Sequence, residues 1–174
     1  QEEKLTDQAR QQLQIAKYYQ VPLEHNLQPD EYTIIVDALF GVGLSRPVEG
    51  RYAEIIHMLN QSGAFRVAVD IPSGINGDTG REMGIGFQAD LTVTFAFCKR
   101  GLCFYPGRMY AGELIVADIG IYADQDRKPS MAYLEKGDLS MLPSRIPWGN
   151  KGTFGKVLLI AGSRGMCGAS CLSS

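Results

Sequence analysis

The chain has 174 residues, the length of one domain with a short extension. Its 17 basic and 19 acidic side chains give a net charge of −2, and no cluster of lysines and arginines offers the basic surface that nucleic acids require. Hydrophobic residues make up 45% and charged residues 21%, a balance that excludes a disordered protein. No apolar run reaches the ~18 residues of a membrane span, and the first residues lack a secretory signal pattern. We therefore expect a cytoplasmic protein without membrane or nucleic-acid partners.

The apolar pattern predicts helices and strands that alternate along the chain. Residues 2–20 place apolar side chains at three- and four-residue spacing among polar ones, which predicts an amphipathic surface helix. Residues 32–37 are an apolar run that ends on aspartate, as in a buried strand, and residues 48–60 return to helical spacing. Three more strands are predicted at residues 65–70, 89–95 and 113–118.

Apolar runs rich in β-branched residues, separated by glycine turns and helices, are typical of a parallel sheet buried on both faces. We therefore expect an α/β fold with a Rossmann-like, mostly parallel sheet flanked by helices in three layers. The composition becomes polar at residues 122–129, and a new predicted strand at residues 156–161 precedes a glycine-rich loop. Residues 1–128 are predicted to form the C-terminal part of one domain, and residues 129–174 a linker and the start of a second α/β domain. We expect a fragment of a longer protein at both ends.

The four cysteines are predicted to be reduced thiols without a metal. Cys98 and Cys103 form one pair in the sequence, and Cys167 and Cys171 form another, but neither spacing matches a zinc framework. Thiols of a cytoplasmic protein are normally reduced. No histidine lies in the motifs where it could complete a Ser–His–Asp or Cys–His catalytic site.

Two predicted strands end on aspartate, Asp37 and Asp70, and a distinctive loop follows each. Ligands of open α/β sheets bind at the carboxyl ends of the strands, near the point where strand order reverses. After Asp37, the loop 41–47 has two glycines and Arg46, and its open N–H groups could receive an anion at the start of the next helix. A turn that needs positive φ explains the glycines equally well. The third glycine of a dinucleotide fingerprint is missing, which disfavours an ordinary NAD-dependent dehydrogenase.

The second loop, residues 70–80, collects carboxylate, hydroxyl and amide oxygens directly after a strand. Such a set suits recognition of sugar hydroxyls or coordination of a hard cation, although a solvated turn uses the same residue types. Asp37 and Asp70 could do acid–base work if burial shifted the pKa of one of them. Lys99 either faces the same crevice or lies exposed on the surface.

Three motifs follow one another along these strands and loops. They are VDALFGVGL at residues 36–44, VDIPSGINGDTG at residues 69–80, and residues 89–101 with Lys99. In this order they resemble the NAD(P)H-hydrate epimerase family. Residues 150–169 resemble the start of the ADP- or ATP-dependent NAD(P)H-hydrate dehydratases, which have a ribokinase-like fold. The two together resemble the bifunctional NAD(P)H-hydrate repair enzymes of bacteria and archaea.

The resemblance implies repair of a damaged cofactor by a homo-oligomeric enzyme. Hydrated NADH and NADPH carry a hydroxyl at C6 of the reduced nicotinamide ring, and the epimerase interconverts their R and S forms. The dehydratase then removes water from the S form with ADP or ATP, with or without Mg²⁺.

The resemblance also implies roles for individual residues. Asp37 and Ser73 match positions that hold a potassium ion, and Asp70 matches the catalytic carboxylate, which also contacts the substrate. Ala169 matches an alanine that contacts the hydrated nucleotide in the dehydratase. The segment around the substrate's phosphates matches Gly41, Val42, Gly43, Leu44, Ser45, Arg46 and Pro47.

Some features of the family have no match in the sequence. Its Asn-Asn-Gly-Gly-Asp loop, which supplies a third potassium ligand, is not found, so we expect this chain by itself to be inactive. Asp37 could instead pair with a basic side chain or with backbone N–H groups. The whole chain could also be a non-catalytic nucleotide-binding module, since related animal domains are described as partners of an apolipoprotein. The dehydratase-like segment favours the enzyme, because a binding module has no need of it.

Overall fold

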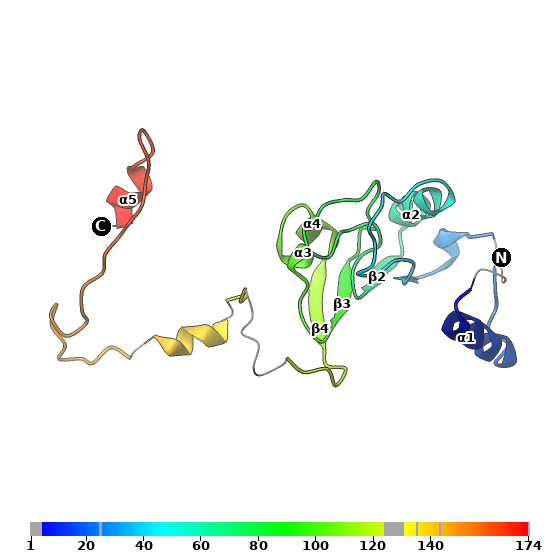
Figure 1. Cartoon of the computed structure of the whole chain (residues 1–174), viewed down its shortest axis with the longest axis horizontal. Helices are drawn as coiled ribbons and strands as arrows, with labels where there is room; N and C mark the ends of the chain where they lie inside the picture. Colours follow the sequence, from blue (N-terminus) through cyan, green and yellow to red (C-terminus); the bar gives the residue numbers. More distant parts are fainter. Residues whose placement is uncertain (1–4, 25, 124–130, 135, 143, 174) are drawn as a thin grey trace. The chain divides into compact units, whose positions relative to one another are not determined.

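The computed structural model describes residues 5–24, 26–123, 131–134, 136–142 and 144–173. The chain divides into two compact units between residues 123 and 124 (Figure 1). In the described residues of neither unit is there a helix with the length and apolar character needed to cross a membrane.

The N-terminal unit follows the predicted order of helices and strands. Thr6 caps the first helix, because its hydroxyl accepts the N–H of Ala9 at 3.3 Å. The second α-helix begins at Arg51, three residues later than predicted, because Gly50 has φ of 59° and ψ of −138°, outside the helical region. The elements are α1 (Asp7–Tyr18), the 3₁₀ helix η2 (Pro29–Glu31), β1 (Ile34–Asp37), α2 (Arg51–Gln61), β2 (Phe65–Val69), β3 (Leu91–Phe95), α3 (Arg100–Cys103), α4 (Gly107–Tyr110) and β4 (Glu113–Ala117).

The four strands form one sheet in the order β1-β2-β3-β4, and every pairing is parallel. Val36 lies opposite Val67, and Val67 lies opposite Leu91, so the strands are in step across the sheet. The carboxyl ends of β1, β2 and β3 therefore meet at one edge. The strand order does not reverse among these four strands, so the candidate site lies at a sheet edge and not at a reversal point.

One face of the sheet carries the core. Ile35 of β1 and Ala68 of β2 pack with Ile56 of α2 and with Phe87, and the last three are fully buried. Burial of a large apolar side chain stabilises a fold by about 1.5–3 kcal/mol. A second apolar cluster, beneath the loop after β2, consists of Ile71, Ile75, Leu102 and Ala111.

The opposite face of β1 is exposed, although the sequence predicts burial of both faces. Ile34 and Val36 expose 58% and 60% of their surface. The amphipathic helix α1 buries none of its residues, so it does not supply the missing cover.

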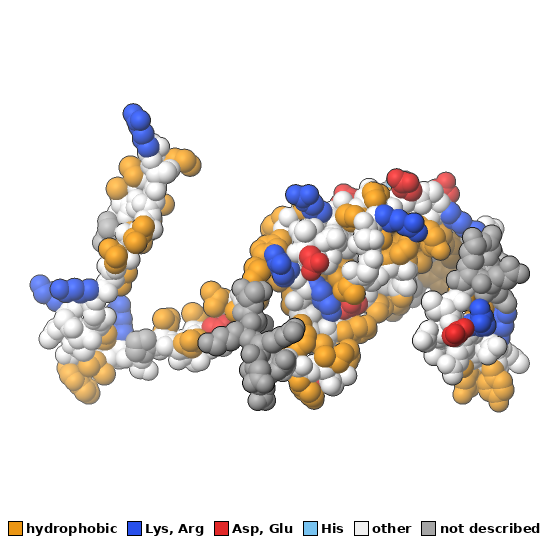
Figure 2. Space-filling view, viewed as in Figure 1, with side chains coloured by type: hydrophobic (Ala, Val, Ile, Leu, Met, Phe, Trp, Pro, Cys, Tyr) orange, Lys and Arg blue, Asp and Glu red, His pale blue; other side chains and the backbone are white. Residues whose placement is uncertain are grey.

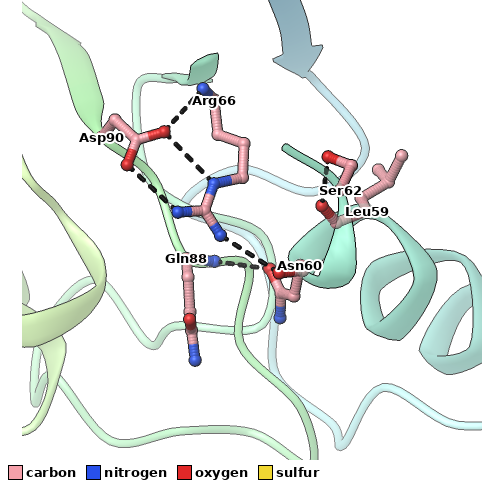
Figure 3. Close-up of polar contacts among 6 residues, drawn as sticks. All are labelled: Leu59, Asn60, Ser62, Arg66, Gln88 and Asp90. Atoms are coloured by element: carbon pink, nitrogen blue, oxygen red, sulfur yellow. Dashed lines mark hydrogen bonds and ion pairs between the residues drawn. The ribbon is translucent and has the colours of Figure 1, made fainter. Parts of the chain in front are cut away.

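The amino ends of β2 and β3 are joined by an ion pair on the far side from the carboxyl edge (Figure 3). The guanidinium of Arg66 donates to both carboxylate oxygens of Asp90, at 3.2 and 3.0 Å, and the Arg66 N–H donates to the same carboxylate at 2.8 Å. Arg66 also reaches the carbonyl of Asn60, whose side chain accepts the N–H of Gln88. Hydrogen bonds from Arg66 hold the pKa of Asp90 below its usual value. This network fixes β2 against β3 and is remote from the candidate site.

The C-terminal unit contains the 3₁₀ helix η3 (Lys136–Met141) and α5 (Gly168–Ser173) among its described residues. The strand predicted at residues 156–161 does not form: Val157 and Ile160 expose 92% and 88% of their surface. A strand needs a neighbour for its hydrogen bonds, and the described part of this unit provides none.

In Figure 2, the basic side chains of the N-terminal unit lie among acidic ones on the face shown.

Candidate active site

Asp37 and Ser73 meet at the carboxyl edge of the sheet. Asp37 ends β1, Ser73 lies three residues after Asp70, and each exposes only 1% of its surface. The backbone N–H of Ser73 donates to Asp37 Oδ2 at 2.7 Å, and its hydroxyl donates to Oδ1 at 2.6 Å. The N–H of Leu39 donates to Oδ1 at 3.2 Å. Burial raises the pKa of Asp37, and these hydrogen bonds only partly oppose it.

The oxygen atoms around Asp37 could serve as ligands of a hard cation. The Ser73 hydroxyl accepts the N–H of Phe40 at 2.9 Å and lies 3.4 Å from the Phe40 carbonyl oxygen. A carboxylate, a hydroxyl and a carbonyl oxygen thus converge, and no basic side chain of the described residues contacts the carboxylate. The donor set suits potassium, which takes oxygen ligands. The sequence also left open that Asp37 pairs with backbone N–H groups, and the N–H groups of Leu39 and Ser73 do donate to it.

Asp70 follows β2 in a left-handed backbone conformation, with φ of 69°. Its carboxylate accepts the N–H of Phe95 at 3.0 Å and the hydroxyl of Thr94 at 3.2 Å, both from the end of β3. The ammonium group of Lys99 forms an ion pair with the same oxygen and donates to the Phe95 carbonyl at 2.8 Å. Lys99 therefore faces the crevice, which was one of the two alternatives left open by the sequence.

The electrostatic state of Asp70 differs from that of Asp37. Burial raises the pKa of Asp70, but the hydrogen bonds from Lys99, Phe95 and Thr94, together with the charge of Lys99, outweigh it. The pKa of Asp70 therefore lies below its usual value. The Asp70 carboxylate is ionised and paired with the ammonium group of Lys99, whereas the buried Asp37 carboxylate contacts no basic side chain of the described residues.

Residues 41–47 form an open loop beside a cavity of about 260 Å³. Neither Gly41 nor Gly43 has a positive φ, and a β-carbon at either would meet open space. The fold therefore does not require these glycines, and their effect is to leave the loop backbone accessible. The loop does not run directly into α2, because residues 48–50 lie between them. The cavity is lined by Phe40, Leu44, Arg46, Pro47, Val48, Glu49 and Tyr52.

Only part of the loop 70–80 contributes to this edge. The side-chain oxygen of Asn76 accepts the N–H groups of Asp78 and Thr79 and the Thr79 hydroxyl, at 3.1, 2.9 and 2.9 Å. These groups close a local turn, so they match the solvated-turn alternative and not the ligand-binding one. A β-carbon at Gly101 would overlap the carbonyl oxygen of Asn76, so this turn packs directly against α3 and positions Lys99.

Sequence reasoning missed two members of the site. Thr94 alternates with Thr92 along β3, and the period-two pattern could have placed both on the inner face. The Phe40 carbonyl carries no signal in its side chain. Ala169 lies on α5 in the C-terminal unit.

A family model described as YjeF-related protein N-terminus matches residues 1–101. The chain belongs to this family. The resemblance inferred from the motifs is thereby confirmed. Members of similar sequence include proteins named for NAD(P)H-hydrate chemistry.

One similar protein is an NAD(P)H-hydrate epimerase of Levilactobacillus brevis, 52% identical over 126 residues, which are 72% of this chain and 58% of that protein. Another is a bifunctional NAD(P)H-hydrate repair enzyme Nnr of Thermofilum pendens, 46% identical over 82% of this chain and 27% of that protein. The Nnr protein of Methanothermobacter thermautotrophicus is 40% identical over 85% of this chain and 27% of its own length. The chain thus spans between about a quarter and three fifths of these relatives.

Proposed function

We propose that the N-terminal unit takes part in epimerising hydrated NADH and NADPH. The observation that carries the proposal is the Asp70–Lys99 ion pair at the carboxyl edge of the sheet, beside the Asp37–Ser73 contact. Membership of the YjeF N-terminal family and the names of its similar members support it.

The reaction inverts a carbon that carries a hydroxyl and is bonded to the ring nitrogen. The nitrogen lone pair can expel the hydroxyl once a proton reaches the departing oxygen, which leaves a planar C=N⁺ group and water. Lys99, as an ammonium ion, is the proton donor in this step, and the Asp70 carboxylate stabilises the cation formed. Water then adds to the other face, its proton passes to Asp70, and Asp70 returns a proton to Lys99 across their contact. Atoms and charges balance over the cycle.

The rest of the edge binds the nucleotide. The open backbone of residues 41–47 and the side chain of Arg46 receive the phosphates. Asp37, the Ser73 hydroxyl and the Phe40 carbonyl would hold a potassium ion, whose charge offsets the repulsion between Asp37 and the phosphates.

We propose further that residues 1–128 belong to the epimerase domain and residues 129–174 to a linker and the start of a dehydratase domain. In that domain Ala169 contacts the hydrated nucleotide, and ADP or ATP, with or without Mg²⁺, drives loss of water. A homo-oligomer in the cytoplasm is part of the same proposal. It rests on similarity to the bifunctional repair enzymes over more than four fifths of the chain.

The test is epimerisation by the whole protein, followed by NMR of separated R and S hydrates. Asp70→Asn keeps the shape of the side chain but removes the base, and loss of a general base costs about 10²–10⁴-fold in rate. Asp78→Asn, in the exposed turn of the same loop, is the matched control and keeps the rate of the unsubstituted protein. Nucleotide binding without epimerisation by the unsubstituted protein would support the binding-module alternative instead.

A further inference from the structure

Two cysteine sulfurs lie in contact beside the proposed catalytic lysine. The sulfurs of Cys98 and Cys103 are 3.2 Å apart, and both residues are partly buried. Cys98 directly precedes Lys99, which caps the amino end of α3, and Cys103 is the last residue of that helix. The two cysteines therefore flank residues 99–102, the short segment that includes Lys99.

The backbone on which the two thiols lie is fixed by the fold. The N–H of Gly101 donates to the Gly77 carbonyl at 2.7 Å, and Leu102, fully buried, donates its N–H to the Lys99 carbonyl at 3.0 Å. Cys98 packs against the apolar cluster that contains Leu102. The backbone hydrogen bonds of Gly101 and Leu102 and the packing of Cys98 thus fix the segment that carries the two sulfurs.

We propose that Cys98 and Cys103 form a reversible disulfide whose closure moves Lys99 relative to Asp70. The site is a modification site regulated by redox state, and its effect on turnover rests on the function proposed above. Cytosolic disulfides, where they occur, are mostly transient and redox-sensing. The sequence prediction of reduced thiols describes the open form of this pair.

The oxidant is a small-molecule disulfide such as oxidised glutathione. The thiolate of Cys103 attacks one sulfur of the oxidant, which forms a mixed disulfide and releases one thiolate. Cys98 then attacks the Cys103 sulfur and expels the second thiolate, which takes the Cys98 proton. Two protein thiols are oxidised to one disulfide, and the oxidant is reduced to two thiols. Burial raises the pKa of Cys98 to about 12, which keeps Cys98 protonated and unsuited to the first attack.

Closure has a geometric consequence for the neighbouring lysine. A disulfide bond is about 2.05 Å long, so the sulfurs approach each other by about one ångström from their 3.2 Å contact. Lys99 is covalently next to Cys98 and contacts Asp70 directly. A displacement of about one ångström at a reacting group can lower a rate by ~100-fold. We expect the oxidised protein to lose at least about tenfold in epimerisation and to regain it on reduction.

Peptide mapping tests the disulfide itself. The unsubstituted protein is equilibrated with oxidised glutathione, alkylated and cut with trypsin, which separates residues 82–99 from residues 101–108. The expected product joins these two peptides and disappears on reduction. Cys167 and Cys171 fall in a different tryptic peptide and do not interfere. If the joined peptide does not form while glutathione oxidises the exposed Cys167, the proposal is overturned.

Two further measurements test the coupling to Lys99. The reactivity of Lys99 toward acetic anhydride should rise after oxidation, because its ion pair with Asp70 is disturbed, while that of the exposed Lys156 stays the same. Cys103→Ser should keep the epimerisation rate and become insensitive to glutathione, whereas Cys167→Ser should remain sensitive. A disulfide that changes neither Lys99 reactivity nor rate overturns the switch. Absence of epimerisation in the reduced protein overturns the proposed function alone, because mapping and labelling still decide the modification.

Discussion

The ion pair between Asp70 and Lys99 makes a prediction that stability measurements can test without any substrate. Lys99→Met keeps an unbranched side chain, one atom shorter, but removes the charge and two hydrogen bonds, one to Asp70 and one to the Phe95 carbonyl. The two side chains expose only 19% and 18% of their surface, so water replaces little of what is lost. A hydrogen bond to a charged group contributes about 1.5–3 kcal/mol, so we expect the loss of two to lower the free energy of unfolding by about 3–6 kcal/mol at pH 7.

A double-mutant cycle separates the pair from its surroundings. Asp70→Asn retains an oxygen that can accept the Phe95 N–H and the Thr94 hydroxyl, so its own cost comes mainly from the lost charge. The combination Asp70→Asn with Lys99→Met should cost less than the sum of the single changes, with a coupling energy of about 1–3 kcal/mol. Urea unfolding is followed by far-UV circular dichroism, which reports on the helices and strands of the N-terminal unit.

The pH dependence has a definite sign. The pKa of Asp70 is lowered in the folded state, so its contribution is present above the unfolded pKa of ~3.9 and is lost as pH falls through the folded pKa. Without Lys99 that lowering is reduced, so the difference in stability between the unsubstituted protein and Lys99→Met should shrink as pH falls below ~4, leaving what the hydrogen bond to the Phe95 carbonyl contributes. Lys156→Met, at an exposed position of the C-terminal unit, is the control and should change neither the free energy of unfolding nor its dependence on pH. A coupling energy of zero, or a difference that is the same at pH 7 and pH 3, refutes the assignment.

Three further predictions concern the cation, the open loop and the close packing of α3. Nucleotide binding by the whole protein should be stronger in potassium than in tetramethylammonium, and Asp37→Ala should abolish that difference; equal affinity in both salts contradicts the ion site. Gly43→Val should weaken nucleotide binding at least about tenfold while stability changes by only about 0.5 kcal/mol, as for the control Gly63→Val, because both β-carbons meet open space. Gly101→Ala should lower the free energy of unfolding by about 1–3 kcal/mol, since its β-carbon overlaps the Asn76 carbonyl; an unchanged urea midpoint would contradict this contact.

The sequence was sufficient for the features that depend on local pattern and on parallel topology. Apolar runs ending on aspartate placed β1 and β2 within two residues of their observed bounds. Since parallel strands end at the same edge, a carboxylate at the end of one and a hydroxyl just beyond the next had to be near each other, and Asp37 and Ser73 are in contact.

Features that depend on long-range packing were not accessible in the same way. Whether Lys99 faced Asp70 or solvent depended on how closely α3 approaches the turn at Asn76, which no periodicity encodes. The apolar run at residues 156–161 satisfies the local pattern of a strand but has no neighbouring strand in the described unit. Likewise, the exposed side of β1 has strand character without a covering layer. Local pattern predicts what a segment can form, and pairing decides whether it does.

The ends of β2 and β3 share an uncommon backbone feature that links the fold to the proposed chemistry. Asp70 and Ala96, each the first residue after its strand, adopt φ of 69° and 58°. The left-handed conformation costs a non-glycine residue about 1–2 kcal/mol, and glycine would avoid that cost. At position 70, glycine would remove the carboxylate that binds Lys99. Ala96 is held by its N–H bond to the Ala117 carbonyl at 2.8 Å, and Lys99, three residues later, contacts Asp70. Strain of this kind persists where the surrounding structure enforces it, and here both strained residues position the same ion pair. Two adjacent strand ends are thus shaped to bring one acid and one base together, which a sheet serving only as a scaffold would not require.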